Sequence, residues 1–215
     1  MMLQAKYLRL AAGIFTILFA SGLYAAKSKN PLDRFSAEQK AKLLKGEAVY
    51  EYMLDEAVDK GSKAHGRAVA LINASAEDGY KIFCAFEKEY LYFPRMTVSK
   101  MLNTNGNVSR VYKELDFSIA TMRYTHFMTR NDKELRIDFE RDPDGVNDFK
   151  ESAGYFQFVK IDDKRCLFIY GLTKGEIGVP VPEFIKKYVT SMDLPNIVLS
   201  VKKRVESGGT WQKDE

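Results

Sequence analysis

The C-terminal part of the chain carries its clearest helical pattern. In the stretch 181–206, apolar side chains recur at steps of three and four residues. They are Leu194, Ile197, Val198, Val201 and Val205. This spacing puts them on one stripe of a helix that must be buried, with the basic residues 202–204 turned away from it. Pro195 predicts a kink or the first turn of a second helix, with Asp193 as its cap.

Alternating apolar and polar residues predict a run of strands before this helix. We expect strands at 47–56, 67–72, 97–102, 108–115, 122–129, 134–141, 154–161 and 165–172. Turn sequences such as Asn105-Gly106 and Asp144-Gly145 separate them at hairpin spacing, which is typical of an antiparallel sheet. After the second strand, Ser75 caps a short helix, and another short helix is expected at 87–92, before Pro94.

The alternation also predicts which side chains face into the sheet. In the strand 134–141, apolar and charged residues alternate strictly, so one side is dry and the other wet. The inward residues of three strands include Met122, Tyr124, His126, Met128, Ile137, Phe139, Phe156 and Phe158. Aromatic and flexible side chains of this kind can line a cavity for an apolar ligand. Composition alone favours the alternative, a solid core.

The first 25 residues have the pattern of an export signal. Lys6 and Arg9 precede the apolar run 10–20, and small residues follow it. An apolar run of about 11 residues is shorter than the roughly 20 that a membrane-spanning helix needs. We therefore expect a cleaved signal peptide at 1–25 rather than an anchor, and a periplasmic or secreted domain at 26–215.

Size and composition are those of one ordinary domain. About 190 residues remain after the signal, enough for a substantial core, and no repeat or linker divides them. The chain holds 33 Lys and Arg against 29 Asp and Glu, and loss of the signal leaves a net charge of about +2, which predicts no nucleic-acid partner. Cys84 and Cys166 could pair in an oxidising compartment, but we favour two partly buried free thiols.

The sequence carries no motif that assigns an enzymatic reaction. It lacks the nucleophile elbow, the dinucleotide-binding glycine motif, the P-loop and the zinc-protease helix signature. With only His65 and His126, a His-rich metal site is excluded, and we expect no metal or cofactor. His126, beside Tyr124, could orient a ligand carbonyl or act as a general acid or base. It could equally be a partly buried histidine satisfied by one hydrogen bond.

Short motifs spread over nearly the whole mature chain resemble a known family in their order and spacing. They are Gly46-Glu47, Arg67-Ala68-Val69, 72–77, Phe93-Pro94-Arg95, 147–149, Gly154-Tyr155-Phe156, Tyr170 and 179–182. Together with the order of elements, they resemble the exported bacterial members of the START-like superfamily. This superfamily includes START lipid-transfer domains, the birch-pollen allergen and the polyketide cyclase or coenzyme Q-binding proteins. The sequence departs from the pattern at Tyr80, where tryptophan is common, and at Ala85, where aspartate is frequent.

The resemblance implies an α+β helix-grip fold. In it a curved antiparallel β-sheet wraps around a long C-terminal α-helix, with two short helices after the second strand. The resemblance also implies a ligand cavity between sheet and helix, and this reverses the preference for a solid core. The ligand-binding residues that we expect are Phe93, Met122, Tyr124, His126, Met128, Ile137, Phe139, Phe156, Phe158, Tyr170, Phe184 and Tyr188.

We therefore expect an exported protein that binds or transfers a hydrophobic small molecule, such as a lipid, isoprenoid, quinone or sterol-like compound. A transient contact with a membrane is a further expectation. Two alternatives remain open. One is a cyclase or aromatase-type enzyme that uses the same cavity, and the other is a protein-interaction module with a filled core. No residue is assigned a catalytic role.

Overall fold

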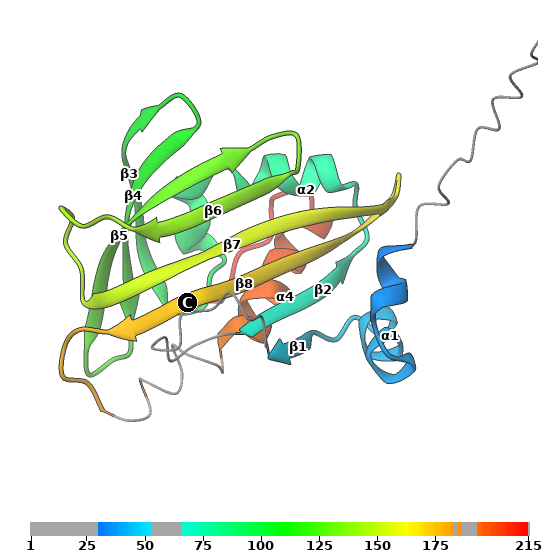
Figure 1. Ribbon diagram of the computed structural model, residues 1–215, viewed down its shortest axis with the longest axis horizontal. Helices are drawn as coiled ribbons and strands as arrows, with labels where there is room; N and C mark the ends of the chain where they lie inside the picture. Colours follow the sequence, from blue (N-terminus) through cyan, green and yellow to red (C-terminus); the bar gives the residue numbers. More distant parts are fainter. Residues whose placement is uncertain (1–29, 53–65, 183–184, 186–192, 215) are drawn as a thin grey trace, which may run out of the picture.

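The computed structural model describes residues 30–52, 66–182, 185 and 193–214, and these contain an eight-stranded sheet with helices packed on it (Figure 1). The strands are β1 (Val49–Tyr52), β2 (Gly66–Ile72), β3 (Met96–Asn105), β4 (Val108–Asp116), β5 (Thr121–Asn131), β6 (Arg136–Arg141), β7 (Phe149–Asp162) and β8 (Arg165–Ile177). Neighbouring strands are all antiparallel, in the order β1-β2-β8-β7-β6-β5-β4-β3. The predicted antiparallel sheet is confirmed.

The helices are short except for the last. They are η1 (Pro31–Arg34), α1 (Ala37–Leu44), α2 (Ala76–Phe83), η2 (Phe86–Leu91) and α4 (Asp193–Glu206). The predicted cap of α2 is present, since the Ser75 side chain accepts a hydrogen bond from the backbone N–H of Asp78. The second short helix, predicted at 87–92, is a 3₁₀ helix that ends before Pro94.

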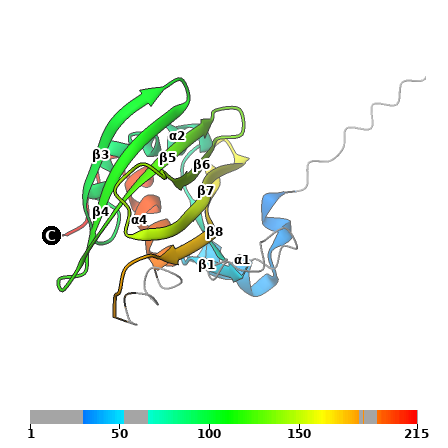
Figure 2. The ribbon, with the colours of Figure 1, turned by 60° about the vertical axis from the view of Figure 1, so that its left-hand side comes forward.

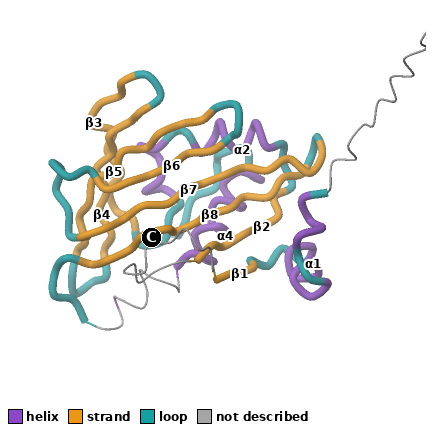
Figure 3. Tube along the Cα trace, viewed as in Figure 1, coloured by secondary structure: helices purple, strands orange, loops and turns teal. Residues whose placement is uncertain are grey.

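The sheet curves around α4, and α2 packs on the same face (Figures 2 and 3). The predicted apolar stripe of α4 is confirmed, because Leu194, Val198, Val201 and Val205 are buried against the sheet. On the opposite face of β2 and β8, η1 and α1 cover a second, smaller apolar cluster. The architecture is therefore an α+β helix-grip fold, with its main core between the sheet and α4.

The far side of α4 differs from the prediction. Arg204 was expected to turn away from the protein, yet its side chain is 6% exposed. Its Nη1 atom donates to the carbonyl oxygen of Trp211 at 2.6 Å, and its guanidinium lies over the ring of Tyr92. The tail 207–214 folds back beside η2, so α4 is covered on two sides, whereas Lys203 is exposed as predicted.

Strands β7 and β8 are longer than the alternation indicated. The predicted strands were 154–161 and 165–172, whereas the observed strands begin at Phe149 and end at Ile177. Register shifts next to Glu151 and between Ala153 and Gly154 interrupt the alternation. The two extended ends pair with each other, with Phe149 opposite Ile177, at the end of the sheet where α4 begins.

Some predictions fall outside the described residues, among them the signal peptide at 1–25 and the residues Phe184 and Tyr188. Residues 181 and 182 are not helical, so the helical stretch predicted from 181 starts later. In the part of the chain that the structure describes, no helix is long and apolar enough to cross a membrane. Cys84 and Cys166 are free thiols, as we favoured.

Candidate functional site

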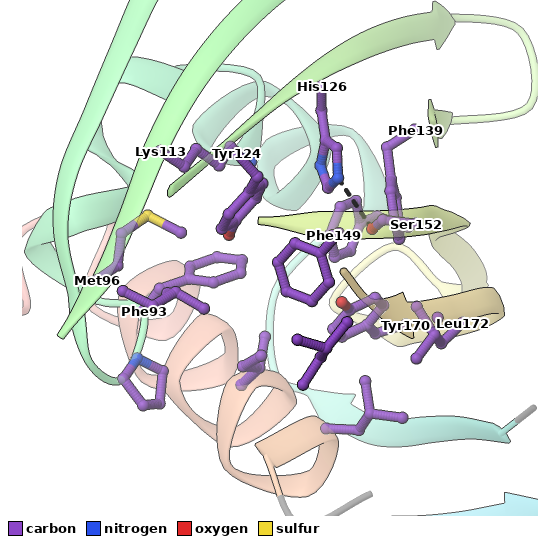
Figure 4. Close-up of a pocket in the computed structure, with 17 residues that line it drawn as sticks. Phe93, Met96, Lys113, Tyr124, His126, Phe139, Phe149, Ser152, Tyr170 and Leu172 are labelled. Atoms are coloured by element: carbon purple, nitrogen blue, oxygen red, sulfur yellow. Dashed lines mark hydrogen bonds between the residues drawn. The ribbon is translucent and has the colours of Figure 1, made fainter. Parts of the chain in front are cut away.

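A pocket lies between the inner face of the sheet and the first turns of α4 (Figure 4). Strands β4 to β8 form most of its wall, and Leu194 and Ile197 close it from the helix. Its volume is about 80 Å³. One water needs roughly 10–15 Å³, and sites for drug-sized ligands begin at roughly 300 Å³. The pocket as it stands fits a single ring or a short chain, and a larger ligand requires its walls to move.

Six of the predicted ligand-binding residues lie on the wall of this pocket: Phe93, Tyr124, His126, Phe139, Phe156 and Tyr170. Their rings are in mutual contact, with centroids 5.2 Å apart for Phe139 and Phe156 and 4.6 Å apart for Phe156 and Tyr170. Strand parity brings five of them to the same face, because each lies on the inward side of its strand, whereas Phe93 lies in the connection between η2 and β3. The wall is therefore rich in aromatic rings.

Four other predicted residues point into the protein but do not line the pocket. Met122, Met128, Ile137 and Phe158 are buried in the core around it. The sheet extends beyond the pocket. The alternation of residues therefore predicts which face of a strand a side chain lies on, but not whether the side chain lies at the level of the pocket. Phe184 and Tyr188 lie outside the described residues.

Several wall residues were not predicted. They include Lys113, Phe149, Ser152, Leu172, Leu194 and Ile197. On β4, Lys113 alternates in step with the apolar residues Val111 and Leu115, so it lies on the same inward face as they do. This alternation is the sequence feature from which its inward position could have been predicted. Phe149 and Ser152 lie on the part of β7 that the interrupted alternation did not indicate.

Lys113 forms a buried ion pair with Glu89 of η2. The Nζ and Oε2 atoms are 2.5 Å apart, and the side chains are 3% and 0% exposed. Burial raises the pKa of the Glu89 carboxyl group, and the ammonium group of Lys113 opposes that rise. Neither carboxylate oxygen of Glu89 has a hydrogen-bond partner among the described residues, although Oε2 takes part in the ion pair. The pair is thus electrically balanced but incompletely hydrogen-bonded.

His126 stands beside this pair as an uncharged group. Burial lowers its pKa well below 6.5, and the positive charge of Lys113 lowers it further. Its Nε2 atom is 2.9 Å from the hydroxyl oxygen of Ser152, and its ring stacks on Phe139 with centroids 5.0 Å apart (Figure 4). At neutral pH the imidazole can donate one hydrogen bond and accept another.

The pair of His126 and Ser152 lacks the third member of a catalytic triad. Within the described ranges, no carboxylate hydrogen-bonds to His126, so nothing acidic orients the ring as a base. Nor does the described part of the chain contain a group of three or more His, Cys, Asp or Glu side chains placed to hold a metal ion. The arrangement is suited to binding an apolar molecule with one or two oriented polar groups.

The architecture is that of START-like proteins. A START superfamily protein from Mycobacterium smegmatis is 18% identical, over 75% of this chain and 99% of that chain, with a TM-score of 0.56. A STAR-related lipid transfer protein from Xanthomonas axonopodis is 13% identical, over 73% and 98%, with a TM-score of 0.55. The Zhui aromatase/cyclase from a Streptomyces species is 10% identical, over 66% and 93%, with a TM-score of 0.58.

At these identities, structural similarity establishes the fold and leaves function to be argued from the site. No protein-family model and no curated protein sequence matches the chain.

Proposed function

We propose that this protein binds and carries a hydrophobic small molecule in the pocket between the sheet and α4. The observation that carries this proposal is a partly enclosed pocket with a wall rich in aromatic rings, placed under the first turns of the last helix. Apolar burial supplies most of the affinity, at about 25 cal/mol for each Å² removed from water. A lipid transfer protein and an aromatase/cyclase are among the proteins that share the fold, which supports an apolar ligand.

Native mass spectrometry tests this proposal on protein purified from its own cell envelope. The expected result is an added mass that solvent extraction releases and identifies as a lipid, isoprenoid, quinone or sterol-like compound. A clean ligand-free mass, with no uptake from a total lipid extract of the same cells, would contradict the proposal. It would favour the interaction module with a filled core.

A second candidate function is a cyclase or aromatase-type reaction in the same pocket. It is favoured by one observation, the contact between His126 and Ser152 on the pocket wall. Mass spectrometry of a polyketide-like β-ketone chain incubated with the protein tests it. Turnover that His126→Gln abolishes while binding persists would support the enzyme, and absence of product would leave the carrier.

Export is part of the proposal and is supported by the sequence pattern of residues 1–25. Expression of the full chain in a bacterium with two membranes, followed by fractionation and N-terminal sequencing, tests it. A mature N-terminus near residue 26 in the periplasmic fraction is expected. An uncleaved chain in the cytoplasm would rule export out.

A transient membrane contact would let the ligand enter and leave. Ile119 and Val146, 67% and 57% exposed, lie on the loops after β4 and β6. Both loops are close in the chain to pocket residues, Leu115 and Phe149 respectively. Co-sedimentation with lipid vesicles should decrease when both are changed to Asp, and unchanged co-sedimentation would exclude this surface.

A further inference from the structure

Lys113 is the single charged residue among the described residues that line the pocket, and its hydrogen bonds are incomplete. A protonated lysine offers three N–H donors. The Nζ atom forms an ion pair with Glu89 Oε2 at 2.5 Å, and among the described residues its hydrogen-bond acceptor is the sulfur of Met128 at 4.0 Å. Thioether sulfur is a weak acceptor. At least one N–H of a 3% exposed ammonium group therefore lacks a strong acceptor in the described part of the protein.

Only one of the two charged groups of the ion pair faces the pocket, and this determines which ligand atoms the pair can contact. Lys113 lines the pocket, whereas Glu89 lies outside the wall, on η2. Both carboxylate oxygens of Glu89 are also without a hydrogen-bond partner among the described residues. Buried polar atoms without partners are costly, and native proteins usually satisfy them with water or ligand. An oxygen of a ligand in the pocket would complete the hydrogen bonds of Lys113.

The net charge of the site determines whether a charged or an uncharged ligand oxygen binds there more favourably. The ammonium group of Lys113 and the carboxylate of Glu89 cancel, and the buried imidazole of His126 is uncharged. A ligand carboxylate would add an uncompensated negative charge to this buried site, which is unfavourable. A ketone, ester, quinone or alcohol oxygen accepts the hydrogen bond and adds no charge.

We propose that Lys113 donates a hydrogen bond to an uncharged oxygen of an otherwise apolar ligand, and that Glu89 makes the site discriminate against carboxylates. This inference rests on the proposed function, because it assumes that the pocket holds an apolar molecule. The ligand class is thereby narrowed to neutral apolar molecules that carry a carbonyl or hydroxyl oxygen.

Three single-ring probes of nearly the same shape test the inference. Acetophenone carries a neutral carbonyl, α-methylstyrene replaces that oxygen with a CH₂ group, and benzoate carries a carboxylate. Affinities come from NMR titrations of the intact folded protein. A hydrogen bond from a charged group contributes roughly a factor of ten to affinity, so acetophenone should bind about tenfold more tightly than α-methylstyrene. It should also bind about tenfold more tightly than benzoate, because the carboxylate adds an uncompensated negative charge.

Two variants separate hydrogen bonding from charge. The double variant Lys113→Met/Glu89→Leu removes the pair without leaving a buried charge, and it should bind acetophenone and α-methylstyrene equally. Glu89→Gln leaves the charge of Lys113 uncompensated, and its affinity for benzoate should rise about tenfold. The matched control Lys150→Met/Glu176→Gln removes an exposed ion pair between β7 and β8 and should keep the wild-type preference.

The outcomes distinguish this inference from the proposed function. Equal affinity of the wild type for acetophenone and α-methylstyrene would overturn the role of Lys113 while supporting an apolar pocket. Benzoate as the tightest wild-type ligand would overturn the charge argument. Binding of none of the three probes would count against the pocket itself. If the double variant fails to fold, the affinities of the wild type for the three probes and the affinity of Glu89→Gln for benzoate still test the inference.

Discussion

At the residue scale, burial decides the chemistry of the pocket more than residue type does. His126 is a titratable group that the fold keeps uncharged, because a charged ring would be desolvated and would face the ammonium group of Lys113. Its ring instead packs between Tyr124 and Phe139, with centroids 4.8 and 5.0 Å away. The histidine thus serves as an uncharged polar group in an aromatic wall.

This burial predicts a stability that depends on pH. The pKa of His126 is lower in the folded protein than in the unfolded chain, where it is about 6.5, so below that pH the unfolded chain binds a proton that the folded protein does not. The free energy of unfolding should therefore fall as the pH drops below about 6.5, by at most about 1.4 kcal/mol per pH unit. Denaturant unfolding between neutral and mildly acidic pH measures it.

The control for this prediction is His126→Gln, which keeps a polar group for Ser152 but cannot gain a proton. Its stability should depend less steeply on pH than that of the wild type. Equal slopes in the wild type and His126→Gln would mean that the ring has the same pKa in the folded protein as in the unfolded chain, and would contradict the prediction.

At the element scale, local patterns predicted most of the fold. The alternation in 134–141 predicted a strand, and the apolar stripe ending at Val205 predicted a helix. Each pattern was sufficient because it follows from one buried face of its element. The burial of Arg204 and the ends of β7 and β8 were missed, since they depend on a tail that folds back and on bulges that break the alternation. Such tertiary contacts leave no local period in the sequence.

The candidate site was predicted less completely for the same reason. Parity identified Tyr124 and Phe156 as inward residues, but the position of the pocket along the strands depends on where α4 crosses them. Lys113 was missed because its partner, Glu89, comes from a separate element. A lysine in an alternating strand indicates a solvated position unless the distant partner is known.

The C-terminal tail is an element whose anchor can be tested. The Nζ atom of Lys213 donates to the backbone oxygens of Phe93 and Met96 at 2.9 and 2.5 Å, and both residues line the pocket. Lys213→Met keeps the apolar stem and loses these bonds, so we expect about 1–2 kcal/mol less stability. Backbone amides of residues 91–97 should also exchange faster.

Chemical unfolding and hydrogen exchange measure these two effects. The matched control is Lys81→Met, on the exposed side of α2, which should change neither quantity. Exchange in 91–97 as slow in Lys213→Met as in the wild type would show that the tail does not hold this part of the pocket wall.

At the scale of the whole molecule, the sheet and α4 enclose a small apolar space at one end of a long core. The rest of that core is filled by side chains such as Phe83 and Phe158, which pack tightly against one another. The open part coincides with the start of α4 and with the polar groups of Lys113 and His126. The carrier proposal depends on the location of this space beside the start of α4, and not on the size of the core.

Filling that space should abolish binding without unfolding the protein. Ile197 lies on α4 and lines the pocket while remaining partly exposed, so Ile197→Trp can place added bulk in the pocket. We expect its affinity for an apolar ligand to fall at least about tenfold. Asn196→Trp makes the same addition one residue away, on the exposed side of the helix, and should bind as the wild type does.

A titration of these three folded proteins with acetophenone, followed by NMR, shows whether this pocket binds an apolar molecule. We expect saturable binding to the wild type and Asn196→Trp, with shifted signals from Phe139, Phe156 and Tyr170, and little or no binding to Ile197→Trp. Equal binding by all three proteins would place the ligand elsewhere and contradict a carrier function for this pocket.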